Sequence, residues 1–185
     1  MDPVMQLSDE MLMSKVAKGE RAQMEPLIRR YANPLLTFIQ RMIGNHHQSE
    51  ELFQEVFLTV WDKREQYQFP RPFRSWLFAI TVNKCRELGR LRRLPALSLD
   101  EALTASPVTD SRPEDRAIAT ETASMVANAV RQLPAQQRAV VVLRIWQGLS
   151  YTEIAGIVGR TEATVRSHMH HGLAGLRKYL EPRLI

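Results

Sequence analysis

The string SYTEIAGIVGRTEATVRSHMHHGL, residues 150–173, constrains the fold more than any other part of the chain. Ser150 and Glu153 have the spacing of a capping box, in which each side chain satisfies a free backbone N–H at a helix start. Gly159 can adopt the left-handed conformation that ends a helix, and Thr161 can cap a second one. Two short helices joined by a glycine turn form a helix-turn-helix, whose second helix fits the major groove of DNA. Nucleic acid is therefore the first partner to test.

Helical spacing of apolar residues extends over nearly the whole chain, and no segment alternates as a half-buried strand does. We expect helices over residues 8–18, 21–44, 49–65, 73–93, 114–132, 135–147, 151–158 and 162–180. Between Pro95 and Pro113 the pattern fails, and prolines, serines, threonines and acidic residues are typical of a linker. The sequence therefore predicts an all-α protein with two small helical domains, residues 1–95 and 114–185, joined by a linker over residues 96–113.

The charge of the chain is divided between segments of opposite sign. The formal net charge is +5. Residues 1–95 carry 15 basic and 11 acidic side chains, residues 96–115 carry 1 and 5, and residues 116–185 carry 9 and 4. Two basic blocks separated by an acidic segment favour two modules that each bind a polyanion.

Several classes of protein are disfavoured by what the sequence lacks. The single cysteine, Cys85, excludes an intramolecular disulfide, argues against a cysteine-based zinc site and is expected to be buried. Acidic residues near the start replace the basic and apolar runs of a signal peptide, and the densest apolar run, residues 139–143, is too short to cross a membrane. No phosphate loop, nucleophile–base pair or metal spacing is evident. We expect a cytoplasmic protein without membrane insertion that is not an enzyme and holds no cofactor or metal.

The segment SEELFQEVFLTVW, residues 49–61, and the Asp62 that follows it have two different faces on a helical wheel. The broad apolar face, typical of a core, consists of Leu52, Phe53, Val56, Phe57, Val60 and Trp61. The opposite face consists of Glu51, Gln54, Glu55, Leu58 and Asp62. A leucine framed by acids and an amide is typical of a docking anchor with a polar rim, while a solvated helix face is the simpler interpretation. An acidic face in a basic protein indicates a protein partner rather than DNA.

Aromatic and basic residues alternate in the segment that follows. Aromatic rings beside cations suit unstacked bases, which offer a π-face and a nearby phosphate. The candidates for this contact are Tyr67, Phe69, Arg71 and Arg74. Trp76 shares a helical face with Leu77 and Ile80, so we expect it in the core.

The helix after these aromatics carries a polar strip at positions i, i+3 and i+7 and ends in arginines. The candidate residues are Asn83, Arg86, Arg90 and Arg93. Asparagine and arginine are side chains that contact base edges and phosphates. A solvated basic helix end is the alternative interpretation.

The second helix of the helix-turn-helix also divides into two faces. We expect Val165, Met169, Gly172, Leu173 and Leu176 to face inward. The outward residues near its N-terminal end, where base edges are contacted, are Ala163, Thr164, Arg166, Ser167 and His170. Arg177 and Lys178 suit phosphates further along the helix.

Three strings in order carry a resemblance to a known family: EELFQEVFLTVW, FRSWLFAITVNKCREL and LSYTEIAGIVGRTEATVRSHMHHGLAGLRKYL. Together they resemble the bacterial sigma-70 family, and the size and two-domain layout match its extracytoplasmic-function (ECF) group. The resemblance covers nearly the whole chain apart from the linker. It implies a factor that binds core RNA polymerase and directs promoter-specific transcription initiation.

The resemblance also implies a role for each surface. Residues 1–95 resemble sigma region 2, so the acidic face would dock on the clamp helices of the polymerase β′ subunit. The aromatic loop and the polar strip would bind and help melt the −10 element. Residues 114–185 resemble region 4, which would read the −35 element and contact the β flap. An anti-sigma factor is a further expected partner.

Two other functions remain open at this point. An autonomous helix-turn-helix regulator would bind a duplex operator unaided, but the acidic face has no role in it. A sigma-like adaptor or decoy would bind polymerase or an anti-sigma factor without DNA, but the basic strip has no role in it.

One departure from the family pattern is Glu87, where the family often has Asp, and we expect Glu87 to face the core side.

Overall fold

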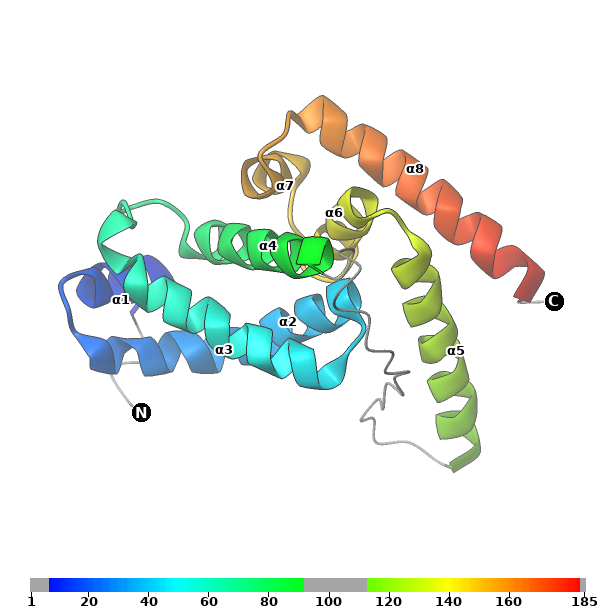
Figure 1. The fold of residues 1–185 in the computed structure, drawn as a ribbon, viewed down its shortest axis with the longest axis horizontal. Coiled ribbons are helices and arrows are strands. Elements are labelled where there is room, and N and C mark those ends of the chain that lie inside the picture. The colour runs from blue at the N-terminus through cyan, green and yellow to red at the C-terminus, as the bar shows by residue number, and fades with distance from the viewer. Residues whose placement is uncertain (1–6, 92–112, 184–185) are drawn as a thin grey trace.

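The computed structural model describes residues 7–91 and 113–183, and all of its regular elements there are helical (Figure 1). The α-helices are α1 (Asp9–Ala17), α2 (Met24–Ile43), α3 (His46–Asp62), α4 (Phe73–Leu91), α5 (Pro113–Gln132), α6 (Ala135–Ile145), α7 (Tyr151–Val158) and α8 (Glu162–Leu180). Single 3-10 turns lie at Arg21–Gln23, Arg64–Gln66 and Glu181–Arg183. The predicted all-α fold is confirmed, whereas nearly all of the predicted linker and Arg93 lie outside the described residues.

Local side-chain chemistry accounts for several of the helix ends. The capping box between Ser150 and Glu153 is complete, and Thr161 accepts a hydrogen bond from the backbone N–H of Thr164. Gly159 ends α7 with a φ of 66°. The start of α3 differs from the prediction, because Asn45 caps it and accepts from the N–H of Gln48. The helix therefore begins three residues earlier than its apolar pattern indicates.

The N-terminal half, α1–α4, encloses an aromatic and aliphatic core. Phe38, Phe73 and Phe78 are fully buried, and the Phe38 and Phe78 rings meet edge to face at 5.4 Å between centroids. Trp76 is buried, as predicted, and so is Cys85. This core holds α3 and α4 in one rigid unit, so both candidate surfaces of this half are carried on helices.

The C-terminal half, α5–α8, is organised around the contact between α6 and α8. Residues 139–143 of α6 are buried, and Gly172 of α8 lies so close that a Cβ there would be 2.6 Å from Val141 Cγ2. Val165 and Met169 face this core as predicted. The prediction for Leu173 is wrong: its side chain is 45% exposed, because Gly172 takes the inward position on that turn.

The two halves pack against each other, which the sequence did not indicate. In Figure 1, α7 lies beside α4 and α6 lies close to α2, while α8 extends away from the N-terminal half. Arg138 of α6 donates to the carbonyl oxygen of Met42 in the last turn of α2, at 2.6 Å. Arg86 of α4 donates to the carbonyl oxygen of Val158, the last residue of α7, at 3.3 Å. Each arginine thus satisfies a carbonyl that a helix C-terminus leaves free, in the half to which it does not belong.

Three further contacts join the two halves. Gln147 is buried, and its side-chain nitrogen donates to the carbonyl oxygen of Pro34 at 3.1 Å. Arg74 donates to the main-chain oxygen of Gln147. The Arg41 guanidinium lies 4.5 Å from the centroid of the Trp146 ring, within the range of a cation–π interaction. Each of these contacts uses a neutral acceptor rather than a carboxylate.

Candidate functional site

The acidic face of α3 is exposed over its whole length. All five residues assigned to it, Glu51, Gln54, Glu55, Leu58 and Asp62, are exposed. Leu58 is 64% exposed, the highest value among the large apolar side chains described. On the opposite side Leu52, Val56 and Val60 are buried in the core. The predicted division of this helix is confirmed, and Leu58 projects from a rigid helix rather than from a loop.

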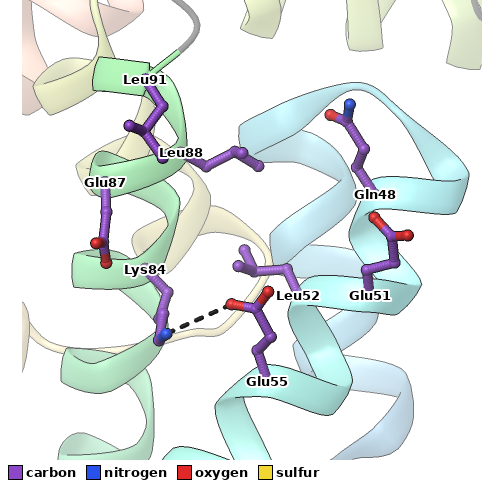
Figure 2. Close-up of a pocket in the computed structure, with 8 residues that line it drawn as sticks. All are labelled: Gln48, Glu51, Leu52, Glu55, Lys84, Glu87, Leu88 and Leu91. Atoms are coloured by element: carbon purple, nitrogen blue, oxygen red, sulfur yellow. Dashed lines mark hydrogen bonds and ion pairs between the residues drawn. The ribbon is translucent and has the colours of Figure 1, made fainter.

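A groove runs between the acidic face of α3 and the end of α4 (Figure 2). Its residues are Gln48, Glu51, Leu52, Glu55, Lys84, Glu87, Leu88 and Leu91. Lys84 forms an ion pair with Glu55 at 3.4 Å. Glu87 is exposed here, which corrects its expected orientation toward the core: Cys85 and Thr81 take the buried side of α4 and place Glu87 opposite. The groove has leucine side chains between acidic rims.

The loop before α4 exposes one of its two candidate aromatic rings. Tyr67 is buried, its hydroxyl donates to the carbonyl oxygen of Arg71, and its ring packs 5.4 Å from that of Trp76. Burial, together with the nearby carboxylates, raises the pKa of Tyr67 to about 12. Tyr67 therefore shapes the loop and offers no stacking surface, which corrects its assignment as a base contact. Phe69 is 58% exposed and Arg71 is exposed, so both remain available.

The polar strip on α4 is partly covered by the C-terminal half. Asn83 and Arg90 are exposed, whereas Arg86 is half-buried against α7. Burial lowers the pKa of Arg86, and the positive charge of Arg160 acts in the same direction. Arg74 is also half-buried, against Gln147. The predicted strip is therefore one surface, but its central arginine, Arg86, is bound to α7 in this arrangement of the two halves.

The outward face of α8 presents the predicted set. Ala163, Arg166, Ser167, His170, Arg177 and Lys178 are exposed. Thr164 is half-buried, because its N–H and hydroxyl both contact the hydroxyl of Thr161 in the helix cap. Arg166 lies among small residues near the start of the helix, and Arg177 and Lys178 lie near its end.

Arg166 is held by residues that the prediction did not include. Its Nε and one terminal nitrogen donate to Glu162 Oε1 at 3.1 and 2.5 Å. The guanidinium also lies 4.5 Å from the centre of the Tyr151 ring. The other oxygen of Glu162 accepts from the Thr152 hydroxyl at 2.8 Å, and these bonds lower the pKa of Glu162, that from Thr152 most. The i, i+4 spacing of Glu162 and Arg166 is a signal that could have revealed the pair.

Comparison with known proteins identifies both halves. The family model described as Sigma-70 region 2 matches residues 27–94, and that described as Sigma-70, region 4 matches residues 123–176. The ECF RNA polymerase sigma factor SigL of Mycobacterium tuberculosis is 31% identical over 172 residues, which cover 91% of this chain and 94% of SigL. The chain belongs to the ECF sigma factors.

Further relatives agree with this family. The ECF sigma factor SigE of Mycolicibacterium smegmatis is 36% identical over 168 residues, and the match spans 89% of this chain and 65% of that protein. A solved structure of CnrH in complex with the cytosolic domain of CnrY has a TM-score of 0.73 at 25% identity, covering 94% of this chain and 97% of that one. The sigma factor RpoE from Bartonella quintana, solved with the anti-sigma factor NepR, shares the fold, with a TM-score of 0.69 at 21% identity over 85% of this chain and 96% of that one.

Membership gives the two halves their functional names. The N-terminal half carries sigma region 2 and the C-terminal half carries sigma region 4. Sigma factors are non-enzymatic regulators that give core RNA polymerase its promoter specificity, so neither the autonomous regulator nor the decoy is favoured. Within the described ranges, no helix is both long and apolar enough to cross a bilayer.

Proposed function

We propose that this ECF sigma factor binds core RNA polymerase through the acidic face of α3 and directs initiation at promoters with separate −10 and −35 elements. The observation that carries the proposal is the presence of three chemically different exposed surfaces on one chain. A subunit that reads promoters would use all three: an acidic face with an apolar centre, an aromatic and basic surface, and a helix-turn-helix. We further propose that it acts in the cytoplasm as a non-catalytic subunit.

The polymerase contact is centred on Leu58. Glu51, Glu55 and Asp62 lie around it and favour a basic partner surface, as on a helical clamp of the β′ subunit. An apolar centre surrounded by a polar rim is the usual arrangement of a protein–protein interface. The C-terminal half is proposed to contact the β flap, as in the family it belongs to.

The −10 contact uses the exposed aromatic ring and the basic strip. Phe69 is the ring on which an unstacked base would stack, a contact worth about 1–3 kcal/mol per base. Arg71, Asn83 and Arg90 are exposed beside it or along α4 and suit phosphates and base edges. Arg74 and Arg86 join this surface once they are released from the C-terminal half, and Arg93, outside the described residues, is a further candidate for this contact.

The −35 contact uses the outward face of α8 in the major groove. Ala163, Thr164, Arg166, Ser167 and His170 lie at the end that meets base edges. Arg177 and Lys178 would contact phosphates, which contribute affinity that decreases with salt. A good bidentate contact from Arg166 to a base pair would contribute about 1–3 kcal/mol of discrimination.

An anti-sigma factor is a further proposed partner. RpoE of Bartonella quintana was solved in complex with the anti-sigma factor NepR, and this chain shares its fold. The acidic groove between α3 and α4 would suit a basic and apolar segment of such a protein. Occupation of that groove would compete with the polymerase.

Run-off transcription tests the proposal. Purified core RNA polymerase is combined with genomic DNA fragments in the presence and absence of this protein, and transcript start sites are mapped. We expect start sites that depend on the protein and share two upstream elements. Transcription without any protein-dependent start site would overturn the proposal, and so would specific binding of an operator duplex by the protein without polymerase.

A further inference from the structure

Arg166 sits in a network that spans both helices of the helix-turn-helix. On its own helix it is bound to Glu162, one turn toward the N-terminus. Across the turn it lies over the ring of Tyr151, the first residue of α7. Glu162 is itself tied to α7 through the Thr152 hydroxyl. The guanidinium is therefore fixed by groups on both helices, whereas an isolated surface ion pair fixes a side chain weakly.

We propose that Glu162 and Tyr151 are positioning residues that direct Arg166 toward one base pair of the −35 element and away from the phosphate backbone. The inference rests on the proposed −35 role of α8 and adds a determinant of its specificity. An arginine reads a base only when its planar guanidinium has one orientation, whereas a long side chain that is free in solvent samples many orientations. Contacts made before DNA arrives remove that freedom in advance.

The charge of Glu162 supplies the second part of the argument. A phosphate approaching Arg166 would also approach this carboxylate and be repelled, whereas a base edge carries no net charge. Both oxygens of Glu162 already have partners, so the carboxylate stays ionised and in place. Removal of its charge should therefore free Arg166 for phosphate contacts, which weakens base preference and strengthens binding to DNA of any sequence.

Tyr151 restricts the position of Arg166 from the other side. Its half-buried ring also lies 4.9 Å from the Arg144 guanidinium, so one aromatic ring contacts two cations. A cation over an aromatic ring is attracted to its face, which keeps the guanidinium plane close to α7. Tyr151→Phe retains this ring, whereas Tyr151→Leu removes it, and the pair separates the ring's role from that of the hydroxyl.

The test is promoter output by the assembled holoenzyme on templates in which each base pair of the −35 element is substituted in turn. The proteins are the wild type, Arg166→Ala, Glu162→Gln, the double variant, Tyr151→Phe and Tyr151→Leu. Glu25→Gln is the matched control, because Glu25 forms the same i, i+4 pair with Arg29 on α2, far from the helix-turn-helix in the chain. Thermal unfolding of each protein checks that its fold is retained.

We expect the wild type to prefer one base pair at one position by roughly fivefold to 150-fold, and Arg166→Ala to lose that preference. Glu162→Gln and Tyr151→Leu should lose most of this base-pair preference, whereas Tyr151→Phe and Glu25→Gln should retain it. In the Arg166→Ala background, Glu162→Gln should change nothing further. Glu162→Gln should also bind nonspecific duplex more tightly, with a steeper dependence on salt.

Four outcomes contradict parts of this scheme and are distinguishable. If wild-type output is indifferent to every −35 substitution, the proposed function of α8 is wrong and the inference fails with it. If Arg166→Ala alone abolishes the preference while Glu162→Gln and Tyr151→Leu keep it, only the inference is overturned. It is also overturned if Glu162→Gln lowers output equally on all templates or acts equally without Arg166.

Discussion

The close approach of α8 to α6 gives a sharp test of how the groove-reading helix is held. Gly172 is buried in this contact, and a Cβ at its position would lie 2.6 Å from Val141 Cγ2. Carbon atoms in contact are normally about 3.5–4.0 Å apart. Val141 is fully buried and its β-branched side chain has little rotamer freedom. Gly172→Ala should therefore push α8 away from α6 by about 1 Å.

The expected magnitude follows from two opposing effects. Alanine is favoured over glycine in a helix interior by about 1 kcal/mol. Overpacking a well-packed contact costs about 1–3 kcal/mol. Gly156→Ala, on α7 in the same half, is the matched control, because a Cβ there meets nothing within 4 Å and only the helix preference changes. The free energy of unfolding of Gly172→Ala should thus be about 1–3 kcal/mol below that of Gly156→Ala.

Urea unfolding followed by circular dichroism measures both variants against the wild type. Equal slopes of the unfolding free energy against urea concentration would show that the three proteins expose similar surface areas on unfolding. A midpoint raised by Gly172→Ala as much as by Gly156→Ala would refute the tight packing of α8 on α6. Promoter output of the Gly172→Ala holoenzyme should fall as well, because the displaced helix carries the −35 contacts.

Three more outcomes are expected. Leu58→Asp should abolish co-purification with core RNA polymerase, whereas Met11→Asp, at an exposed apolar residue on α1, should not; retention by Leu58→Asp would contradict the docking assignment. Arg138→Met should lower the free energy of unfolding by about 1.5–3 kcal/mol, since Arg138 donates to several carbonyl oxygens, and an unchanged urea midpoint would argue against it. Burial raises the pKa of Cys85 to about 12, so its thiol stays protonated at pH 8 and should react with a disulfide reagent slowly in the native protein and fast in denaturant; fast native labelling would contradict this burial.

Helix positions were predictable because their signals are local. Ser150 and Thr161 each accept from a backbone N–H three residues ahead, as their spacing indicates. The start of α3 was missed because its apolar pattern begins well after the Asn45 cap. The acidic face was predictable for a similar reason, since both sides of that helix are encoded in one short segment.

The rest of the candidate site depends on contacts between distant residues. Tyr67 and Phe69 are equivalent in the sequence pattern, and only packing against Phe73 and Trp76 determines that Tyr67 is buried. The partial covering of Arg86 depends on α7, which lies far along the chain. A helical wheel has no information on either contact. Periodicity therefore predicted the helices and most of their faces, with Leu173 and Glu87 as exceptions, but not which arginines are bound to the other half.

The interface between the halves has an unusual dependence on sequence. Met42, Val158, Gln147 and Pro34 all accept through main-chain oxygens, which every amino acid carries. Side chains at Met42, Val158 and Pro34 can diverge between relatives without removing an acceptor, provided that the backbone is kept, whereas Gln147 also donates through its side chain. Apart from the Trp146 ring that faces Arg41, only the donors are constrained, so these hydrogen bonds would leave little trace as co-varying positions in an alignment. Related chains could thus retain the same arrangement of halves while their sequences give no sign of it.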